Sequence, residues 1–105
     1  MDLPVPPIEQ VDLEQVFRAL GDPLRCAVVA ELVADHEDGE RACASFMMPV
    51  AKSTKTHHWR VLRDAGLIRQ RDAGNGTFVQ LRRAELELRF PGLLATLTRL
   101  TQAPR

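Results

Sequence analysis

The sequence predicts a mainly α-helical domain that carries one β-hairpin. Aromatic residues are scarce, with four Phe, one Trp and no Tyr, so the core must consist chiefly of Leu, Val and Ala, which favours packed helices. Several segments repeat apolar residues at steps of three and four, and one segment near the middle alternates apolar and polar residues around a turn signal. At 105 residues, the chain is expected to form a single domain over residues 1–105.

The first third of the chain predicts an arm and two helices. Residues 1–8, "MDLPVPPI", contain three prolines and are expected to form an extended N-terminal arm. Apolar positions from Ile8 to Leu20 then recur at helical spacing, and Gly21 is suited to end that helix. Asp22 and Pro23 are a cap and a first-turn proline, so they predict the start of a second helix. Its apolar stripe consists of Leu24, Val28, Val29, Leu32 and Val33.

Two further helices are predicted before the hairpin. A short helix of about two turns is expected in "ACASFMM", residues 42–48, before Pro49. A longer helix over residues 53–65 ends at Gly66, and Ser53 is a candidate for its cap. A helical projection puts Trp59 at the boundary between a polar and an apolar side. The polar side carries Ser53, Thr56, His57, Arg60 and Asp64, and the apolar side carries Thr54, His58, Val61, Leu62 and Ala65.

The hairpin and one last helix complete the prediction. Residues 67–82 alternate around "DAGNG", and Asn75-Gly76 is the strongest short hairpin signal in the chain. A C-terminal helix is expected within residues 84–101, where Pro91 suits a helix start and the leucines exceed what a small domain easily buries alone. The expected order is therefore four helices, two strands and a fifth helix.

Charge is divided unevenly along a chain whose net charge is zero. Residues 1–51 hold three Arg and ten acids, a net of minus seven, whereas residues 52–83 hold eight Lys and Arg and two acids, a net of plus six. The remaining residues, 84–105, hold three Arg and two acids, a net of plus one. A local basic stretch of this kind is typical of phosphate binding.

The order of elements predicts a winged helix-turn-helix that binds double-stranded DNA. A short helix, a tight turn and a second helix with cations and hydroxyls at its start match the arrangement in which the second helix enters the major groove. The hairpin then forms a wing, with Arg69 and Arg71 before its tip and Arg82 and Arg83 after it. We expect groove contacts from Lys52, Ser53, Lys55, Thr56, His57 and Arg60, and wing contacts from Arg71, Asn75 and Thr77.

The adjacent histidines predict neither a metal site nor a catalytic site. Side chains of neighbouring helical residues diverge by about 100°, so His57 and His58 cannot face one ion. The zinc spacing H-E-x-x-H is absent, because Val61 and Leu62 follow four residues later. About 10 Å of helical rise separates His57 from Asp64, which leaves no triad. No enzyme activity and no cofactor are expected, and His58 is interpreted as a hydrogen-bonded core residue.

The chain resembles the ArsR/SmtB family of bacterial winged-helix repressors over residues 10 to 100. The resemblance lies in "ALGDPLRCAVVAEL", in "KSTKTHHWRVLRDAGLI" for the recognition helix, and in "RDAGNGTFVQL" for the wing. It implies a homodimer held by the first and last helices, with residues 84–101 as the dimerisation helix. It also implies a repressor that leaves its operator when a metal or another signal binds.

Two departures from the family pattern concern the recognition helix and the metal sites. Ala51 stands where a serine often begins the recognition helix. A third-helix metal site in the family uses Cys-x-Cys, but Cys43 has no partner two residues on, and the last helix has no histidine. A transition metal needs such soft ligands, so no metal site is expected and the effector is unassigned.

Two alternative functions are left open by the sequence. In one alternative, Cys26 and Cys43 form a reversible disulfide in a thiol-based redox-responsive repressor. In the simpler interpretation, both are small hydrophobic residues of the core. The winged helix could also serve for protein contact only, although that use would not need the basic concentration. Two cysteines and no secretion signal predict a cytoplasmic protein. No apolar run reaches the roughly 20 residues that a membrane-spanning helix needs, so no membrane partner is expected.

Overall fold

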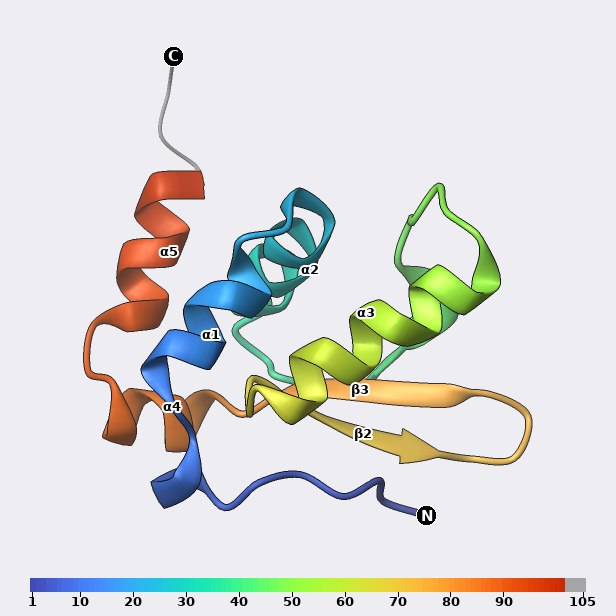
Figure 1. Ribbon diagram of the computed structural model, residues 1–105, viewed down its shortest axis with the longest axis horizontal. Coiled ribbons are helices and arrows are strands. Elements are labelled where there is room, and N and C mark those ends of the chain that lie inside the picture. Colours follow the sequence, from blue (N-terminus) through green and yellow to red (C-terminus); the bar gives the residue numbers. More distant parts are fainter. Residues whose placement is uncertain (102–105) are drawn as a thin grey trace.

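The computed structural model describes residues 1–101, and these contain five α-helices and a three-stranded antiparallel sheet. Residues 102–105, the end of the expected domain 1–105, lie outside the described residues. Figure 1 shows α3 above the sheet, α1 and α2 in the middle of the molecule and α5 at its left end. The elements are α1 Leu13–Leu20, α2 Pro23–Ala34, β1 Arg41–Ala42, α3 Lys52–Asp64, β2 Ile68–Asp72, β3 Thr77–Leu81, α4 Arg83–Arg89 and α5 Leu93–Thr101.

The predicted second helix is confirmed, whereas the predicted first helix begins too early. The Asp22 carboxylate accepts a hydrogen bond of 3.0 Å from the backbone N–H of Arg25, and Pro23 occupies the first turn of α2. Residues Ile8–Gln10 form only a 3₁₀ turn, after which Val11 and Asp12 are extended. Asp12 caps α1 through the N–H of Glu14, so the helix begins at Leu13 instead of Ile8.

The predicted helix over residues 42–48 is absent. Residues Arg41–Ala42 instead form strand β1, which pairs with β3, and Cys43–Ser45 make a single 3₁₀ turn. Backbone groups that pair with β3 cannot also serve a helix, and Phe46 and Met48 turn inward with 5% exposure each. The expected two-stranded hairpin is therefore a three-stranded sheet in the order β1-β3-β2.

The wing hairpin is confirmed, although its turn differs from the expected one. Asp72 pairs with Thr77, so residues 73–76 form a four-residue loop instead of a two-residue Asn75-Gly76 turn. Gly74 takes the left-handed conformation, with φ of +87°, and its N–H donates to the Asp72 carboxylate at 2.9 Å. A second bond, from the Ala73 N–H to the Gly76 carbonyl at 2.9 Å, closes the loop.

The predicted C-terminal helix over residues 84–101 is split into α4 and α5. Pro91 has no N–H to donate, and Gly92 has a φ of +88°, so the chain turns between Phe90 and Leu93. The observed order is therefore α1, α2, β1, α3, β2, β3, α4, α5.

All five helices and the sheet contribute to one hydrophobic core. Val16, Val29, Leu62 and Ile68 have no exposed surface, and Leu86 and Leu94 bring α4 and α5 onto the same cluster. The N-terminal arm, predicted over residues 1–8, lies along the free edge of β2. There the Leu3 N–H donates to the Gln70 carbonyl at 2.9 Å.

Candidate nucleic-acid interface

The first turns of α3 form an exposed surface of cations and hydroxyls. Every residue from Ala51 to His57 is exposed, and so is Arg60. The sequence put Thr54 on the buried side, which is wrong, because the core contacts of α3 begin only at His58. Ser53 does not cap the helix: Ala51 occupies the cap position and makes no side-chain bond. The amide groups of the first turn therefore remain available to an external acceptor.

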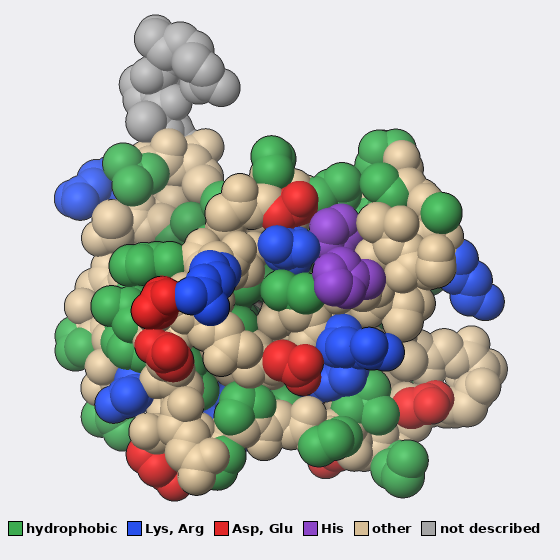
Figure 2. All heavy atoms as spheres, viewed as in Figure 1, with side chains coloured by type: hydrophobic (Ala, Val, Ile, Leu, Met, Phe, Trp, Pro, Cys, Tyr) green, Lys and Arg blue, Asp and Glu red, His purple; other side chains and the backbone are tan. Residues whose placement is uncertain are grey.

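Two buried residues in the middle of α3 hold this surface in place. Trp59 is 5% exposed and contacts Phe46 edge-on, with ring centroids 5.4 Å apart. His58 is 8% exposed, and its Nδ1 accepts a hydrogen bond of 3.0 Å from Arg25 of α2. The prediction of a hydrogen-bonded core histidine is therefore confirmed. His57 is exposed, and Figure 2 shows histidine side chains beside Lys and Arg side chains on this face.

The positive charge is concentrated on α3 more strongly than the sequence indicated. Each of the four wing arginines forms an ion pair with an acid that lies outside residues 52–83. The net charge of plus six counted for that segment therefore omits these acids. The pairs are Arg69–Glu85 at 2.6 Å, Arg71–Glu40 at 2.9 Å, Arg82–Glu85 at 3.0 Å and Arg83–Asp38 at 2.6 Å. Within residues 1–101, Lys52, Lys55, Arg60 and Arg63 of α3 make no such pair, whereas the four wing arginines share three acids, so α3 carries most of the unneutralised charge.

These ion pairs change the titration of their carboxylates. A hydrogen bond from Arg71 lowers the pKa of Glu40 below its ordinary value, and a hydrogen bond from Arg82 does the same for the pKa of Glu85. Arg82 is itself buried, with 1% of its side chain exposed, and also donates to the Pro6 carbonyl at 2.9 Å. Arg82 therefore joins the wing to the N-terminal arm and is enclosed by protein.

A groove of about 290 Å³ separates α3 from the wing. Of the predicted contact residues, Thr56 and Arg60 from α3 and Thr77 from β3 line this groove together. Lys52, Ser53, Lys55 and His57 lie on α3 but do not line the groove. Arg71 lies on the opposite face of β2 from Gln70, and Asn75 lies in the wing loop. The Thr56 hydroxyl donates to the Lys52 carbonyl at 3.1 Å, so one of its hydrogen bonds is already used.

Sequence reasoning missed two polar residues of the groove. Arg63 donates to the Gln70 side chain at 2.6 Å, and Gln70 donates to the Cys43 sulfur at 3.8 Å. The alternation of β2 contained the signal, because Gln70 points opposite to Arg69 and Arg71 and hence toward α3. These contacts fix the wing relative to the recognition helix.

The remaining titratable side chains do not gather into a ligand set. Among residues 1–101, no three His, Cys, Asp or Glu side chains lie close enough to hold a metal ion. Cys26 and Cys43 are both free thiols. Cys26 lines a shallow cavity beside α2 and α5, whereas Cys43 lies against the sheet, where burial raises the pKa of its thiol.

Comparison with known proteins assigns the family. A helix-turn-helix domain model matches residues 20–71. The crystal structure of the ArsR family transcriptional regulator RHA00566 has the same fold, with a TM-score of 0.60 and 24% identity over 97% of this chain and 100% of that one. The uncharacterized HTH-type transcriptional regulator YceK of Bacillus subtilis (strain 168) is 30% identical over 83 residues, which cover 79% of this chain and 83% of YceK. The chain belongs to the HTH-type transcriptional regulators, and its fold is that of an ArsR family regulator.

The resemblance deduced from the recognition helix and wing is thus confirmed for the fold, which matches an ArsR family regulator, and for the class of HTH-type transcriptional regulators. The relatives that the chain matches are named as transcriptional regulators. The part of the regulator within residues 1–101 has no helix with the length and apolarity to cross a bilayer.

Proposed function

We propose that this ArsR-like regulator is a dimeric repressor that binds an operator in double-stranded DNA through α3 and the wing. The observation that carries the proposal is the exposed start of α3, where Lys52, Lys55 and Arg60 have no acidic partner among residues 1–101. Unneutralised cations on a helix that is firmly packed along its other side are suited to the major groove.

Each predicted contact residue has a role in this proposal. Lys52 and Lys55, with the free amides of the first turn, bind phosphates, whereas Ser53, Thr56, His57 and Arg60 reach base edges. Asn75 in the wing loop and Thr77 at the start of β3 follow the DNA backbone or the minor groove. Arg71 joins them once it leaves Glu40. The contacts to base edges then specify the operator, and the phosphate contacts position the protein on it.

Exposed apolar residues support the homodimer. Leu13 and Phe17 lie one turn apart on α1 and are 39% and 55% exposed, while Leu88 on α4 and Leu100 on α5 are 82% and 69% exposed. Figure 2 shows hydrophobic side chains exposed at the left of the view, where Figure 1 has α4 and α5. Covering such side chains with a second copy stabilises a dimer, and two copies of α3 about 34 Å apart then fit a near-palindromic operator.

The proposal treats residues 1–105 as one cytoplasmic DNA-binding domain with no catalytic site, metal or thiol switch. The Cys43 thiol has a raised pKa, which reduces its thiolate fraction and hence its reactivity toward oxidants and Cys26. The metal-free form is supported by the donor set of residues 1–101, which does not bring together at one point the several thiolate, imidazole or carboxylate ligands that a transition metal needs.

The proposal is tested by selecting duplexes from a random pool with the purified protein and then measuring affinity for the best duplex. The double variant Thr56→Ala/Arg60→Ala should keep the fold and bind at least about 30-fold more weakly, because each lost base contact is worth roughly 1–3 kcal/mol. The matched control Arg18→Ala/Thr96→Ala removes the same residue types from exposed positions on α1 and α5, and it should bind normally.

Two results would contradict the proposed DNA-binding surface or the proposed function. Equal affinity of the wild type and the Thr56→Ala/Arg60→Ala variant would place the interface on another face. No duplex binding at low ionic strength would instead favour a winged helix that contacts protein only, because counterion release accompanies phosphate contact.

A further inference from the structure

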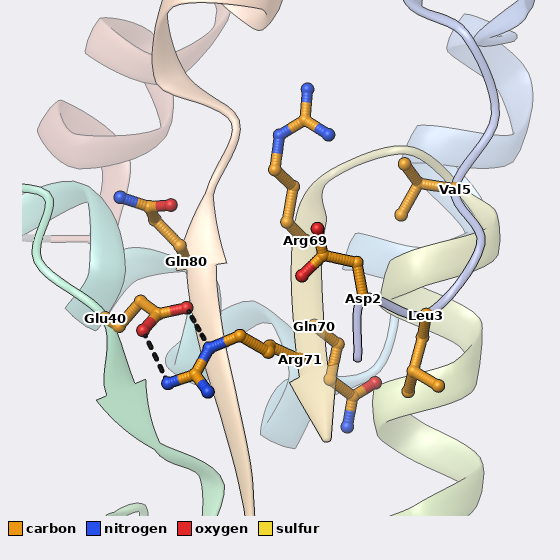
Figure 3. A pocket seen from close by; sticks show the side chains of 8 residues that line it. All are labelled: Asp2, Leu3, Val5, Glu40, Arg69, Gln70, Arg71 and Gln80. Carbon is orange, nitrogen blue, oxygen red and sulfur yellow. Dashed lines mark hydrogen bonds and ion pairs between the residues drawn. The ribbon is translucent and has the colours of Figure 1, made fainter. Parts of the chain in front are cut away.

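The outer face of the wing carries an ion pair that spans one strand. Arg71 projects from β2, and Glu40 lies immediately before β1, on the other side of β3 (Figure 3). Arg71 Nη2 donates to Glu40 Oε1 at 2.9 Å, and Arg71 Nε donates to Oε2 at 3.1 Å. The carboxylate thus occupies two donors of the guanidinium in the forked geometry that a phosphate would also use.

Arg71 differs from Arg82 and Arg83 because its ion pair is exposed to solvent; Arg69 is 50% exposed as well, but its acid, Glu85, is shared with the buried Arg82. The side chains of Arg82 and Arg83 are 1% and 25% exposed, and both donate to backbone carbonyls as well as to acids. Arg71 and Glu40 are 39% and 40% exposed, so water and salt screen their attraction. Arg71 is also the wing arginine nearest the loop over residues 73–76. It is therefore the one best placed to change partners when DNA approaches.

The surroundings of Arg71 keep its guanidinium on the protein in the absence of DNA. Its carbon Cζ lies 4.9 Å from the centre of the Phe78 ring, which faces it from β3. Asp2 of the N-terminal arm pairs with Arg71 in an antiparallel β-bridge, which brings a second acid to the same edge of the sheet (Figure 3). Glu40 nonetheless supplies the direct partner among the described residues.

We propose that Glu40 competes with a DNA phosphate for Arg71. The inference rests on the proposed function, since it concerns how the wing takes part in DNA binding. In the free protein, Arg71 is held by Glu40; in the complex, it turns to a phosphate and leaves Glu40 to water. Glu40 therefore weakens DNA binding and makes it less sensitive to salt than the number of arginines on the wing suggests.

The test measures duplex affinity over a range of salt concentrations for the wild type and Glu40→Gln, using the duplex selected from the random pool. Glu40→Gln should bind up to about fivefold more tightly for each wing at low salt, which is the worth of an exposed ion pair. Added salt screens that ion pair in the wild type, so the gain should shrink as salt rises and the slope of log affinity against log salt should be steeper for Glu40→Gln. The control Glu37→Gln removes the same charge from an acid that makes no ion pair within residues 1–101, and its slope should equal that of the wild type.

Arg71→Ala completes a double-mutant cycle. If Glu40 acts through Arg71, Glu40→Gln has no effect in the Arg71→Ala background. The inference is overturned if the tighter binding persists there, because Glu40 then merely repels DNA, and also if Glu40→Gln changes neither affinity nor slope. If the wild type binds DNA and Glu40→Gln binds it identically, this inference alone is refuted. If the wild type does not bind DNA, the proposed function is refuted.

Discussion

Replacing Gly66 with Ala should destabilise the join between the recognition helix and the wing. Gly66 has a φ of +87°, and a Cβ there would overlap Cγ2 of Val11 and lie 3.1 Å from its Cγ1. Val11 is 2% exposed and has little room to move. The left-handed conformation costs an alanine about 1 kcal/mol, and overpacking adds roughly 1–3 kcal/mol. The free energy of unfolding should therefore fall by about 2–4 kcal/mol.

The assay is urea unfolding followed by circular dichroism at one fixed protein concentration, because a dimer makes stability depend on concentration. Gly74→Ala is the matched control: Gly74 also has a φ of +87°, but a Cβ there would meet nothing within 4 Å. It should lose only about 1 kcal/mol. In a Val11→Ala background, the added cost of Gly66→Ala should shrink. Equal losses at Gly66 and Gly74 would refute the argument that Val11 closes this turn.

Three further outcomes follow from the ion pairs, the exposed leucines and the caps. Glu85→Gln should lower the free energy of unfolding by about 2 kcal/mol near neutral pH, since it leaves the buried Arg82 unpaired. Arg82 lowers the pKa of Glu85 from 4.5, so the wild-type advantage should be full above pH 4.5 and vanish as the pH falls through the lowered value; an advantage that persists at lower pH contradicts this. In sedimentation, Leu100→Glu should shift the protein from dimer to monomer. The control Met47→Glu changes a residue that is 92% exposed in the loop before α3, and it should remain a dimer. If both variants are dimers, the proposed interface is contradicted. Thermal unfolding of Asp22→Ala should reveal a loss of about 1 kcal/mol, and an unchanged midpoint would argue against the cap.

Local signals predicted the elements that local interactions determine. The recognition helix, expected over residues 53–65, occupies Lys52–Asp64, and the second helix begins at its predicted cap and proline. Strand β1 escaped detection because it has only two residues and exists through pairing with β3, about 37 residues later in the chain. The split of the last helix was foreshadowed by Pro91 and Gly92, which local rules allow either to start or to interrupt a helix.

The same limit applies to the interface. The exposed cations of α3 follow from helical spacing, and the core position of His58 was deduced from its side of the helix. Neutralisation of the wing arginines involves Asp38, Glu40 and Glu85, which approach only after the chain has folded. A count of charge along the sequence therefore overstates the positive charge of the wing and understates the share of α3.

The most direct test of the DNA-binding surface is amide NMR of the labelled protein as the selected duplex is added. The account predicts that the largest shift changes fall at residues 52–60 of α3 and at the wing loop, residues 73–77, while amides of α2 in the core change little. Changes confined to α4 and α5, or none at any duplex concentration, would contradict the assignment of this surface to DNA.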